Sequence, residues 1–187
     1  MKELTIIAGP NGSGKSTLAS QIELAGNYIN ADKCEKNFLQ HISDPEAREQ
    51  QAVIMVAKEI REHINVDLPF AFETVFATES IPSFLTKAKE KGYTISLHYI
   101  ATEDVEINIE RVAKRVSEGG HNVPKEKIIK RYQKTLSLLP ILLDFCDKAI
   151  LYDNSQETLR PFLVKEHNEI KIIDTPPKWA KKALLLF

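Results

Sequence analysis

The feature that most constrains the fold is an eight-residue segment near the amino terminus. Residues 9–16 read Gly-Pro-Asn-Gly-Ser-Gly-Lys-Ser and fit the pattern G-x-x-x-x-G-K-[ST] without a mismatch. A largely apolar run, 4–8, precedes the segment, and a helix-like run follows it. Strand, glycine-rich loop and helix in this order are the context in which the pattern forms a phosphate-binding loop. The segment therefore predicts a nucleotide site, with a plain strand-to-helix turn as the alternative.

Each part of this loop has an expected role. Backbone N–H groups in a glycine-rich turn surround phosphate oxygens, and the positive end of the helix dipole adds to the attraction. In such loops the lysine, here Lys15, reaches the β- and γ-phosphates, and the hydroxyl of Ser16 binds Mg²⁺. The expected nucleotide-binding residues are Gly9, Pro10, Asn11, Gly12, Ser13, Gly14, Lys15, Ser16 and Thr17.

Composition limits the broad class of protein. The 187 residues, with 43% hydrophobic and 27% charged side chains, predict one globular domain over 1–187 with a substantial core. The net charge of −1 gives no reason to expect binding to nucleic acid or to a membrane surface. Cys34 and Cys146 form no CxxC pair, and no run approaches the ~20 apolar residues of a membrane span. A cytoplasmic location is expected, because the amino terminus has no signal-peptide pattern.

Hydrophobic patterning alternates between strand-like and helix-like segments. This alternation predicts a parallel sheet of about five strands with helices on both faces, as in P-loop nucleotide-binding proteins. The expected strands are 4–8, 27–30, 70–74, 93–100 and 149–152, and the expected helices are 15–24, 45–65, 81–91, 103–116 and 124–145, the last kinked or broken near Pro140.

Capping residues and turns refine these limits. Asp44 before Pro45 predicts the start of the helix 45–65. Gly92 predicts the end of the helix 81–91. Past the last parallel strand, two β-like runs, 162–165 and 170–173, predict a hairpin appended to the core. A short amphipathic helix is expected over 176–187, so that 160–187 forms a carboxyl-terminal appendage.

Two acidic residues stand at the ends of expected strands, Asp32 just after the second and Glu73 at the end of the third. In parallel sheets ligands bind outside the carboxyl ends of the strands, so Asp32 and Glu73 are expected beside the phosphate loop. Asp32 can accept a proton from a substrate hydroxyl as a general base, or it can be a helix N-cap. Glu73 can hold a substrate hydroxyl or a water on Mg²⁺, or it can form a structural ion pair.

A basic segment over about 111–131 predicts a mobile helical lid. Arg111 and Arg115 share a helix face, and a Gly-Gly-His-Asn break separates them from Arg131. Arginines on a mobile cover neutralise the charge that develops on a transferred phosphoryl group and exclude water. The alternative is a solvated helix pair whose arginines are bound by Glu110 and Glu118. His121, between the glycines and the second helix, is either a loop residue or a site residue.

Taken together, these blocks resemble the zeta toxin family of P-loop kinases. The blocks occur in the family's order and span about residues 1–155. The matching segments are Gly9 to Thr17, Ile29-Asn30-Ala31-Asp32, Phe72-Glu73-Thr74, the stretch from Arg115 through Gly119-Gly120-His121-Asn122-Val123-Pro124 to Arg131-Tyr132, and Leu151-Tyr152-Asp153-Asn154-Ser155.

The resemblance implies an ATP- or GTP-dependent, Mg²⁺-requiring kinase of UDP-activated amino sugars, chiefly UDP-N-acetylglucosamine. It also implies a small helical antitoxin as partner. The implied catalytic residues are Lys15, Asp32, Arg115 and Arg131, and the implied substrate-binding residues are Asp32, Glu73, Thr74 and His121. The chain departs from the longer toxins by its Gly-Gly-His segment, where a lid arginine is expected, and by the hairpin over 162–174.

Three other functions remain open on the sequence. The phosphate loop also begins many ABC-type ATPases, although this chain has no LSGGQ-like segment and no apolar strand that ends in Asp-Glu. A kinase of a nucleotide, a polynucleotide end or another metabolite keeps the same fold with a different acceptor. A nucleotide-binding protein without catalysis is the third alternative, which intact Lys15, Ser16 and Asp32 disfavour.

Overall fold

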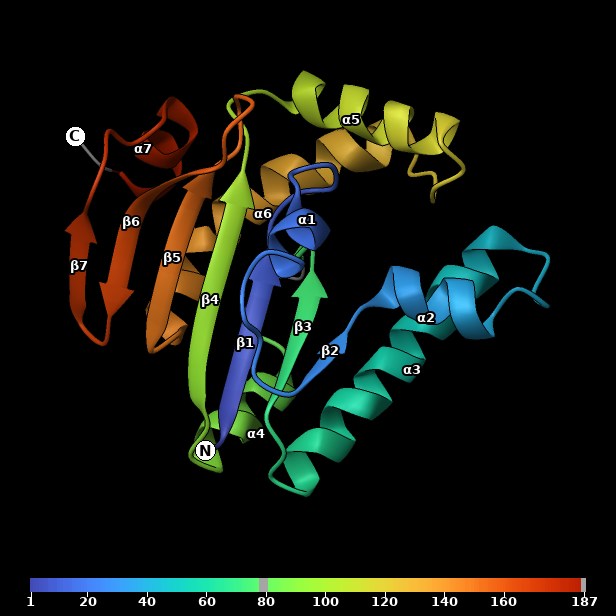
Figure 1. The fold of residues 1–187 in the computed structure, drawn as a ribbon, viewed down its shortest axis with the longest axis horizontal. Helices are drawn as coiled ribbons and strands as arrows, with labels where there is room; N and C mark the ends of the chain where they lie inside the picture. The colour runs from blue at the N-terminus through green and yellow to red at the C-terminus, as the bar shows by residue number, and fades with distance from the viewer. Residues whose placement is uncertain (78–80, 186–187) are drawn as a thin grey trace.

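The central element is a seven-stranded sheet in the order β2-β3-β1-β4-β5-β6-β7 (Figure 1). The computed structural model describes residues 1–77 and 81–185; the remainder of the expected helix to Phe187 lies outside the described residues. The strands are β1 (Glu3–Ala8), β2 (Asn27–Ile29), β3 (Phe70–Thr74), β4 (Thr94–Ala101), β5 (Lys148–Asp153), β6 (Arg160–Glu166) and β7 (Glu169–Ile172).

The first five strands are parallel, as expected from the alternation of strands and helices. β1 lies between β3 and β4, and its last residue, Ala8, is opposite Thr74 on one side and Tyr99 on the other. The carboxyl ends of β1 and β3 are therefore level with each other. Whatever follows β1 and β3 in the chain begins at the same edge of the sheet.

Most helices pack on one face of the sheet. Figure 1 shows α4 and α6 behind the strands. The largest buried cluster joins strand residues such as Leu4, Phe70 and Leu97 to side chains from four helices, namely Ile60 and Ile64 of α3, Leu85 of α4, Leu139 and Leu142 of α6, and Trp179 of α7. The helices are α1 (Lys15–Ala19), α2 (Ala31–Phe38), α3 (Pro45–Asn65), α4 (Ser83–Glu90), α5 (Val105–Ser117), α6 (Lys125–Phe145) and α7 (Lys178–Leu184).

The opposite face carries a smaller apolar cluster. Here Ile7 of β1 and Ile100 of β4 pack with Leu18 and Ala19 of the short helix α1. This cluster lies next to the phosphate loop, because α1 begins directly after it. The packing of α1 therefore fixes one end of that loop against the sheet.

Two of the expected caps are confirmed. The Asp44 side chain accepts hydrogen bonds from the amides of Glu46 and Ala47, with Pro45 at the first position of α3. α4 ends before Gly92, whose φ of 81° lies in the left-handed region. Both features depend only on neighbouring residues, so the sequence pattern was sufficient to place them.

The expected helical limits were wrong at two places near the amino terminus. α1 ends at Ala19 instead of continuing to residue 24. The amide of Ser20 is shared between the carbonyls of Ser16 and Thr17, and the amide of Gln21 bonds Leu18, three residues back, so the last turn is tighter than an α-helix. Helix α2 was not among the expected helices, although the alternative of Asp32 as an N-cap implied a helix at this place. Five of its eight residues are polar, and three apolar residues are too few to mark a helix.

Of the two alternatives expected near Pro140, a kink or a break, the break is wrong. α6 continues through this proline to Phe145. The helix keeps Leu138, Leu139, Leu142 and Leu143 buried on both sides of Pro140. We attribute the continuity to this burial, which outweighs the lost backbone hydrogen bond.

The carboxyl-terminal hairpin is a confirmed element with an unexpected position. β6 pairs antiparallel with β5, and β7 pairs with β6, so the hairpin extends the central sheet. Phe162 of β6 is fully buried and its ring meets that of Trp179 of α7 edge-on, with centroids 5.4 Å apart. The hairpin and α7 are thus part of the main core.

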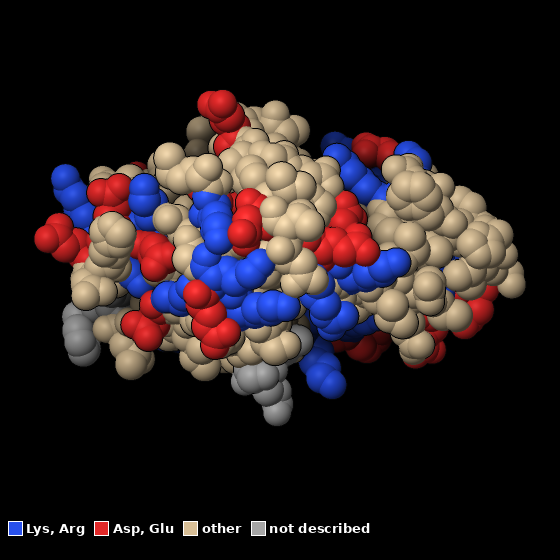
Figure 2. Space-filling view, turned by 90° about the horizontal axis from the view of Figure 1, so that it is seen from below, with Lys and Arg blue, Asp and Glu red and all other residues tan. Residues whose placement is uncertain are grey.

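The amino ends of the strands form the opposite end of the molecule. Seen from this side, lysine, arginine, aspartate and glutamate side chains are interspersed over the surface (Figure 2). Ion pairs here join residues that precede different strands, as in Lys2–Asp67 at 3.1 Å and Lys91–Asp67 at 3.0 Å. Opposite charges neutralise each other on this face.

Candidate active site

The phosphate loop connects β1 to α1 and has a backbone that only glycine adopts easily. Gly14 has a φ of 102°, and a Cβ atom built on it would lie 2.4 Å from the Asn154 amide nitrogen. A side chain at this position would therefore strain the backbone and displace Asn154. The glycine before the lysine in the pattern is thus needed for a physical reason that does not depend on any ligand.

Two asparagines hold the loop from outside. The side-chain Nδ2 of Asn108, on α5, donates to the carbonyl of Asn11 at 2.6 Å. The side-chain Nδ2 of Asn154, after β5, donates to the carbonyl of Ser13 at 2.7 Å. Tyr132 of α6 donates to the carbonyl of Thr102, whose hydroxyl contacts Asn108. The loop is thus held in shape by three separate elements. Sequence reasoning missed Asn108, because nothing local marks it.

Lys15 is the most buried charged group of the site. Its side chain is 7% exposed, and its Nζ donates to the carbonyl of Pro10 at 2.9 Å. Burial lowers the pKa of Lys15 below its usual value, while the carboxylates of Glu73 and Asp32 oppose that shift. Of the three protons on the ammonium group, one is thus accounted for by the carbonyl of Pro10.

Glu73 is the penultimate residue of β3 and lies beside this lysine. Its Oε1 lies 4.0 Å from the Lys15 Nζ, and its Oε2 accepts hydrogen bonds from Ser16 Oγ at 2.8 Å and from the Tyr28 hydroxyl at 2.5 Å. The carboxylate therefore connects the lysine and the hydroxyl of the phosphate loop to β2. The next residue, Thr74, accepts a hydrogen bond from the Phe76 amide on its Oγ1.

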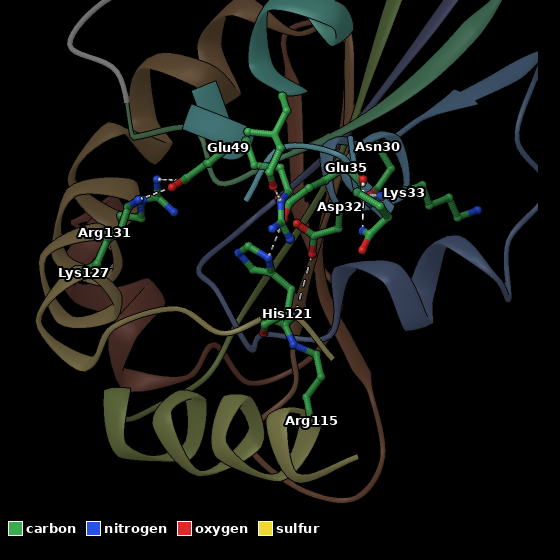
Figure 3. Close-up of polar contacts among 12 residues, drawn as sticks. Asn30, Asp32, Lys33, Glu35, Glu49, Arg115, His121, Lys127 and Arg131 are labelled. Atoms are coloured by element: carbon green, nitrogen blue, oxygen red, sulfur yellow. Dashed lines mark hydrogen bonds and ion pairs between the residues drawn. The ribbon is translucent and has the colours of Figure 1, made fainter. Parts of the chain in front are cut away.

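Asp32 lies in the first turn of α2 and is not its N-cap. Asn30 is the cap, with its side-chain oxygen accepting the amide of Lys33 at 2.9 Å. The alternative of an N-cap aspartate is therefore wrong, although Asp32 still benefits from the helix dipole. Its carboxylate lies 3.8 Å from Arg115 Nη1 across the site (Figure 3).

The segment between α5 and α6 closes over α2. Arg115 Nη2 donates to the carbonyl of His121 at 2.8 Å, and His121 Nδ1 lies 3.4 Å from Glu35 Oε1 (Figure 3). Arg48 of α3 lies 3.7 Å from the same oxygen of Glu35. Arg115 and His121 of the predicted lid thus have their ionic partners on α2, and neither partner is Glu110 or Glu118.

A second ionic cluster joins α6 to α3. Arg131 Nη2 and Lys127 Nζ contact the two oxygens of Glu49 at 3.0 and 2.5 Å (Figure 3). Burial raises the pKa of Glu49, but the hydrogen bonds from Lys127 and Arg131 outweigh it and leave the pKa below its usual value. Glu49 therefore stays ionised and holds both cations toward the interior.

Unsatisfied polar atoms concentrate at this end of the sheet. Among the described residues, five buried side-chain polar atoms have no hydrogen-bond partner, and four of them are Asn11 Oδ1, Ser13 Oγ, Arg111 Nη1 and Arg115 Nε. Buried polar atoms without a partner carry a desolvation cost of about 1–3 kcal/mol each. Two of the four are cationic donors, whose natural partner is an anion.

These groups open into one large cavity of about 1360 Å³. Its lining includes Lys15, Ser16, Asp32, Glu73, Thr74, Arg111, Arg115, His121 and Arg131. Most of the site residues expected from the sequence are therefore brought together. Gly9, Pro10 and Ser13 are the nucleotide-binding positions that do not line it.

The site also contains residues that the sequence did not indicate. Tyr28, Glu35 and Glu49 hold Glu73, His121 and Arg131 respectively. For Glu49 a signal existed, because it lies on α3 about one helical turn before the apolar residue Val53 and therefore on the same side of the helix. For Glu35 the signal was its spacing of three from Asp32, which has meaning only once α2 is known.

The donor set suits magnesium bound together with phosphate. No group of three or more His, Cys, Asp or Glu side chains fit for a metal occurs within residues 1–77 and 81–185. Mg²⁺ is commonly held by one or two protein oxygens and by substrate phosphates. The Ser16 hydroxyl and the Glu73 carboxylate, 2.8 Å apart beside Lys15, provide such oxygens. The residues present therefore fit Mg²⁺.

Comparison with known proteins places this arrangement in a family. The family model described as Zeta toxin matches residues 1–158. The chain belongs to the zeta toxin family. The match includes the phosphate loop, Asp32, Glu73 and the lid, and it ends before the β6–β7 hairpin and α7.

Relatives and solved structures agree with this assignment. An uncharacterized protein of Haemophilus influenzae is 33% identical over 130 residues, which are 66% of this chain and 88% of that protein. The structure of the PezAT toxin–antitoxin system of Streptococcus pneumoniae matches with a TM-score of 0.64 and 17% identity, over 95% of this chain and 75% of that one. The structure of the AvrRxo1-ORF1:ORF2 complex with ATP matches with a TM-score of 0.74 and 12% identity. This match covers 92% of this chain and 61% of that one. At these identities the structural matches show a common fold.

Within the described part of the chain, no helix combines the length and the apolar character needed to cross a bilayer.

Proposed function

We propose that this zeta toxin family member is an ATP- or GTP-dependent kinase that phosphorylates a hydroxyl of a UDP-amino sugar. The observation that carries the proposal is the meeting of Lys15, Asp32, Glu73 and Arg115 in one cavity. A lysine of a phosphate loop, a carboxylate within reach of it and a lid arginine are the parts that phosphoryl transfer requires.

The cavity has room for more than the end of a nucleotide. Its volume of about 1360 Å³ exceeds the ~300–1,000 Å³ of a pocket for one small ligand. Four basic side chains of α6 line it, at the spacing of one helix face: Lys127, Lys130, Arg131 and Lys134. A basic wall of this kind suits the diphosphate of a nucleotide sugar.

The proposed reaction is an in-line displacement. Asp32 takes the proton of the acceptor hydroxyl, whose oxygen forms a bond to the γ-phosphorus as the bond to the β-bridging oxygen breaks. Lys15 and Arg115 neutralise the charge on the phosphoryl oxygens. Arg115 now lies 3.8 Å from Asp32, so it turns from this carboxylate to the phosphoryl group as the acceptor enters. Ser16 and Glu73 would hold Mg²⁺, which supplies further neutralising charge on the phosphates.

The purine of the phosphoryl donor, ATP or GTP, occupies a separate cavity in this proposal. A second cavity of about 380 Å³ lies beside the phosphate loop, lined by Gly14, Thr17, Leu18, Gln21, Asn154 and 157–159. Competition between ATP and GTP in a binding assay, with Gln21→Ala as a probe, tests whether the purine occupies this cavity.

The test of the reaction is a transfer screen read by mass spectrometry. UDP-N-acetylglucosamine, other UDP-sugars, nucleosides, polynucleotide ends and common metabolites are each incubated with protein, Mg²⁺ and ATP or GTP. The proposal predicts a product heavier by one phosphoryl group from a UDP-amino sugar. A product from another acceptor instead, or hydrolysis of ATP without any acceptor, would contradict it.

The first mutational prediction concerns the base. Asp32→Asn should lower kcat by about 10²–10⁴, because it removes general-base catalysis, while nucleotide affinity stays within a factor of a few. Glu46→Gln is the matched control, since Glu46 is an acidic residue in the first turn of α3 that lies outside the cavity lining. Equal rates for Asp32→Asn and the control would remove Asp32 as the base.

The proposal also includes a protein partner, a small helical antitoxin. The PezAT and AvrRxo1-ORF1:ORF2 structures are complexes of related folds with partner chains. We infer that a small helical antitoxin restrains this chain. Expression of the wild-type chain alone should slow bacterial growth, and expression of Asp32→Asn should not; growth equal to that of the variant would contradict a toxic activity.

A further inference from the structure

Tyr28, which the sequence did not single out, has its hydroxyl fully engaged beside the phosphate loop. This hydroxyl donates to Glu73 Oε2 at 2.5 Å and accepts from the amide of Asn30 at 3.2 Å. Asn30 in turn caps α2 through its side-chain oxygen. The ring is half-buried, with the ammonium of Lys33 4.7 Å from its centre. Both the ring and the hydroxyl are thus held in one position.

The bond from Tyr28 to Glu73 is of the strong kind. O–H donors to a carboxylate at about 2.5–2.7 Å form charge-assisted hydrogen bonds, which are roughly twice as strong as neutral ones. An ionised carboxylate has no proton to donate, so the phenol O–H is the donor of this bond and Glu73 is the acceptor.

The same carboxylate oxygen accepts a second hydrogen bond, from Ser16 Oγ at 2.8 Å. A serine hydroxyl has one proton and two lone pairs. With its proton directed to Glu73, Ser16 has its lone pairs available for a cation. The position of the Glu73 carboxylate therefore determines the direction in which the Ser16 oxygen faces.

We propose that Tyr28 is a positioning residue for magnesium: it holds the Glu73 carboxylate so that Ser16 presents its oxygen lone pairs to Mg²⁺ bound with a nucleoside triphosphate. This inference rests on the proposed function only in requiring a magnesium–nucleotide complex at the phosphate loop. It is independent of the acceptor. Residues that orient metal ligands from behind are typically worth about 10–100-fold in metal affinity.

Tyr28→Phe separates this role from simple packing. The substitution keeps the ring that packs in the small cluster with Leu18 and removes only the hydroxyl. Glu73 then keeps the Ser16 bond and the distant Lys15, but it loses the donor that fixes its orientation. The matched control is Tyr93→Phe, which removes a hydroxyl that donates to the carbonyls of His63 and Leu68 at the other end of the sheet.

The experiment is calorimetric binding of a non-hydrolysable ATP analogue at several Mg²⁺ concentrations and in EDTA. For Tyr28→Phe we expect the Mg²⁺ concentration for half-maximal enhancement of binding to rise by about 10–100-fold. Binding in EDTA should equal that of the wild type. Tyr93→Phe should match the wild type in both conditions, although it melts at a lower temperature.

Glu73→Gln gives a second test that does not depend on the stability of the Phe variant. It should show the same loss of magnesium response, and adding Tyr28→Phe to it should cause no further loss, because both changes act through one carboxylate. Additive losses in the double variant would overturn the inference. A wild-type magnesium response in Tyr28→Phe, or equal weakening in EDTA, would also overturn it.

The result distinguishes this inference from the proposed function. If the wild-type chain binds the analogue in a magnesium-dependent way but phosphorylates no acceptor, the proposed kinase fails and the role of Tyr28 is still decided by the variants. If the wild-type chain binds no nucleotide in any condition, both fail together.

Discussion

The charged residues at the two ends of the parallel sheet differ in how many partners the protein gives them. At the amino ends of the strands, Lys91 donates to the carbonyls of Ile64 and Asn65 and to Asp67, at 2.7, 2.9 and 3.0 Å. At the carboxyl ends, Lys15 has one hydrogen bond to a carbonyl and a carboxylate 4.0 Å away. One lysine is saturated by the protein, whereas the other is buried with few partners.

The same contrast holds for the neighbouring groups. Asp67 and Asp147 are paired with lysines at the amino end, while Arg111 and Arg115 at the carboxyl end keep buried nitrogens without a partner. Charges that satisfy each other contribute to stability, whereas buried donors without a partner lower it. We infer that the charges at the amino ends stabilise the fold, and that the donors at the carboxyl ends are placed for a ligand.

The largest expected effect would sharpen this contrast at Lys15. Lys15→Met should lower phosphoryl transfer by at least about 10²–10³, since a cation aimed at the transferred phosphoryl group is lost. The free energy of unfolding should change by no more than about 1 kcal/mol, because the desolvation that lowers the pKa of Lys15 is removed with the charge. Steady-state kinetics and urea unfolding measure the two quantities. Severe destabilisation with normal transfer would break the comparison.

Lys91→Met should show the reverse pattern, with an intermediate effect. It leaves two carbonyls near the end of α3 without their donor, so unfolding should become easier by about 1–3 kcal/mol. The transfer rate of the folded protein should not change. Lys58→Met is the control, because Lys58 is exposed on α3 with only an i,i+4 pair to Glu62. A change in kcat for Lys91→Met would contradict a purely structural amino end.

The smallest expected effect is the pH dependence at Asp67. Hydrogen bonds from Lys91 and Lys2 lower the pKa of Asp67 below its usual value. A carboxylate whose pKa is lower in the folded state adds stability that is present above about pH 4 and lost as the pH falls through the folded pKa. Asp67→Asn should therefore flatten the fall in stability below that pH.

Urea unfolding between about pH 2 and 5 checks this prediction, and high salt should reduce the difference because the group is exposed. A fall in stability of the same steepness in wild type and Asp67→Asn would show that this pair contributes nothing measurable.

Local patterns predicted much of the fold correctly. The phosphate loop, the Asp44 cap, the order of strands and helices and the terminal hairpin all depend on residues close together in the chain. Helix α2 was not among the expected helices because only three of residues 31–38 are apolar, and α6 continues through Pro140 because buried leucines on both sides hold it. Tertiary packing overrode the local rule in the second case.

The partners of the site residues were outside the reach of the sequence. Asp32 was expected either as a base or as an N-cap, and only the structure assigns the cap to Asn30. Glu110 and Glu118 were expected to bind the arginines of the lid only in the alternative to a phosphate clamp, and Arg115 and Arg131 instead contact Asp32 and Glu49. An ion pair on one helix follows from spacing, but a pair between helices depends on how they pack.

From the sequence alone it was possible to predict that a glycine-rich loop lies between a buried strand and a helix, that Asp32 follows the second strand and that Glu73 lies near the end of the third. This was possible because strand period, glycine conformation and helix capping act over a few residues. Only the tertiary structure decided that Glu73 joins Ser16 and Tyr28, which are 57 and 45 residues away in the chain. The strand order β2-β3-β1 brings them together, and that order is set by packing of the whole sheet.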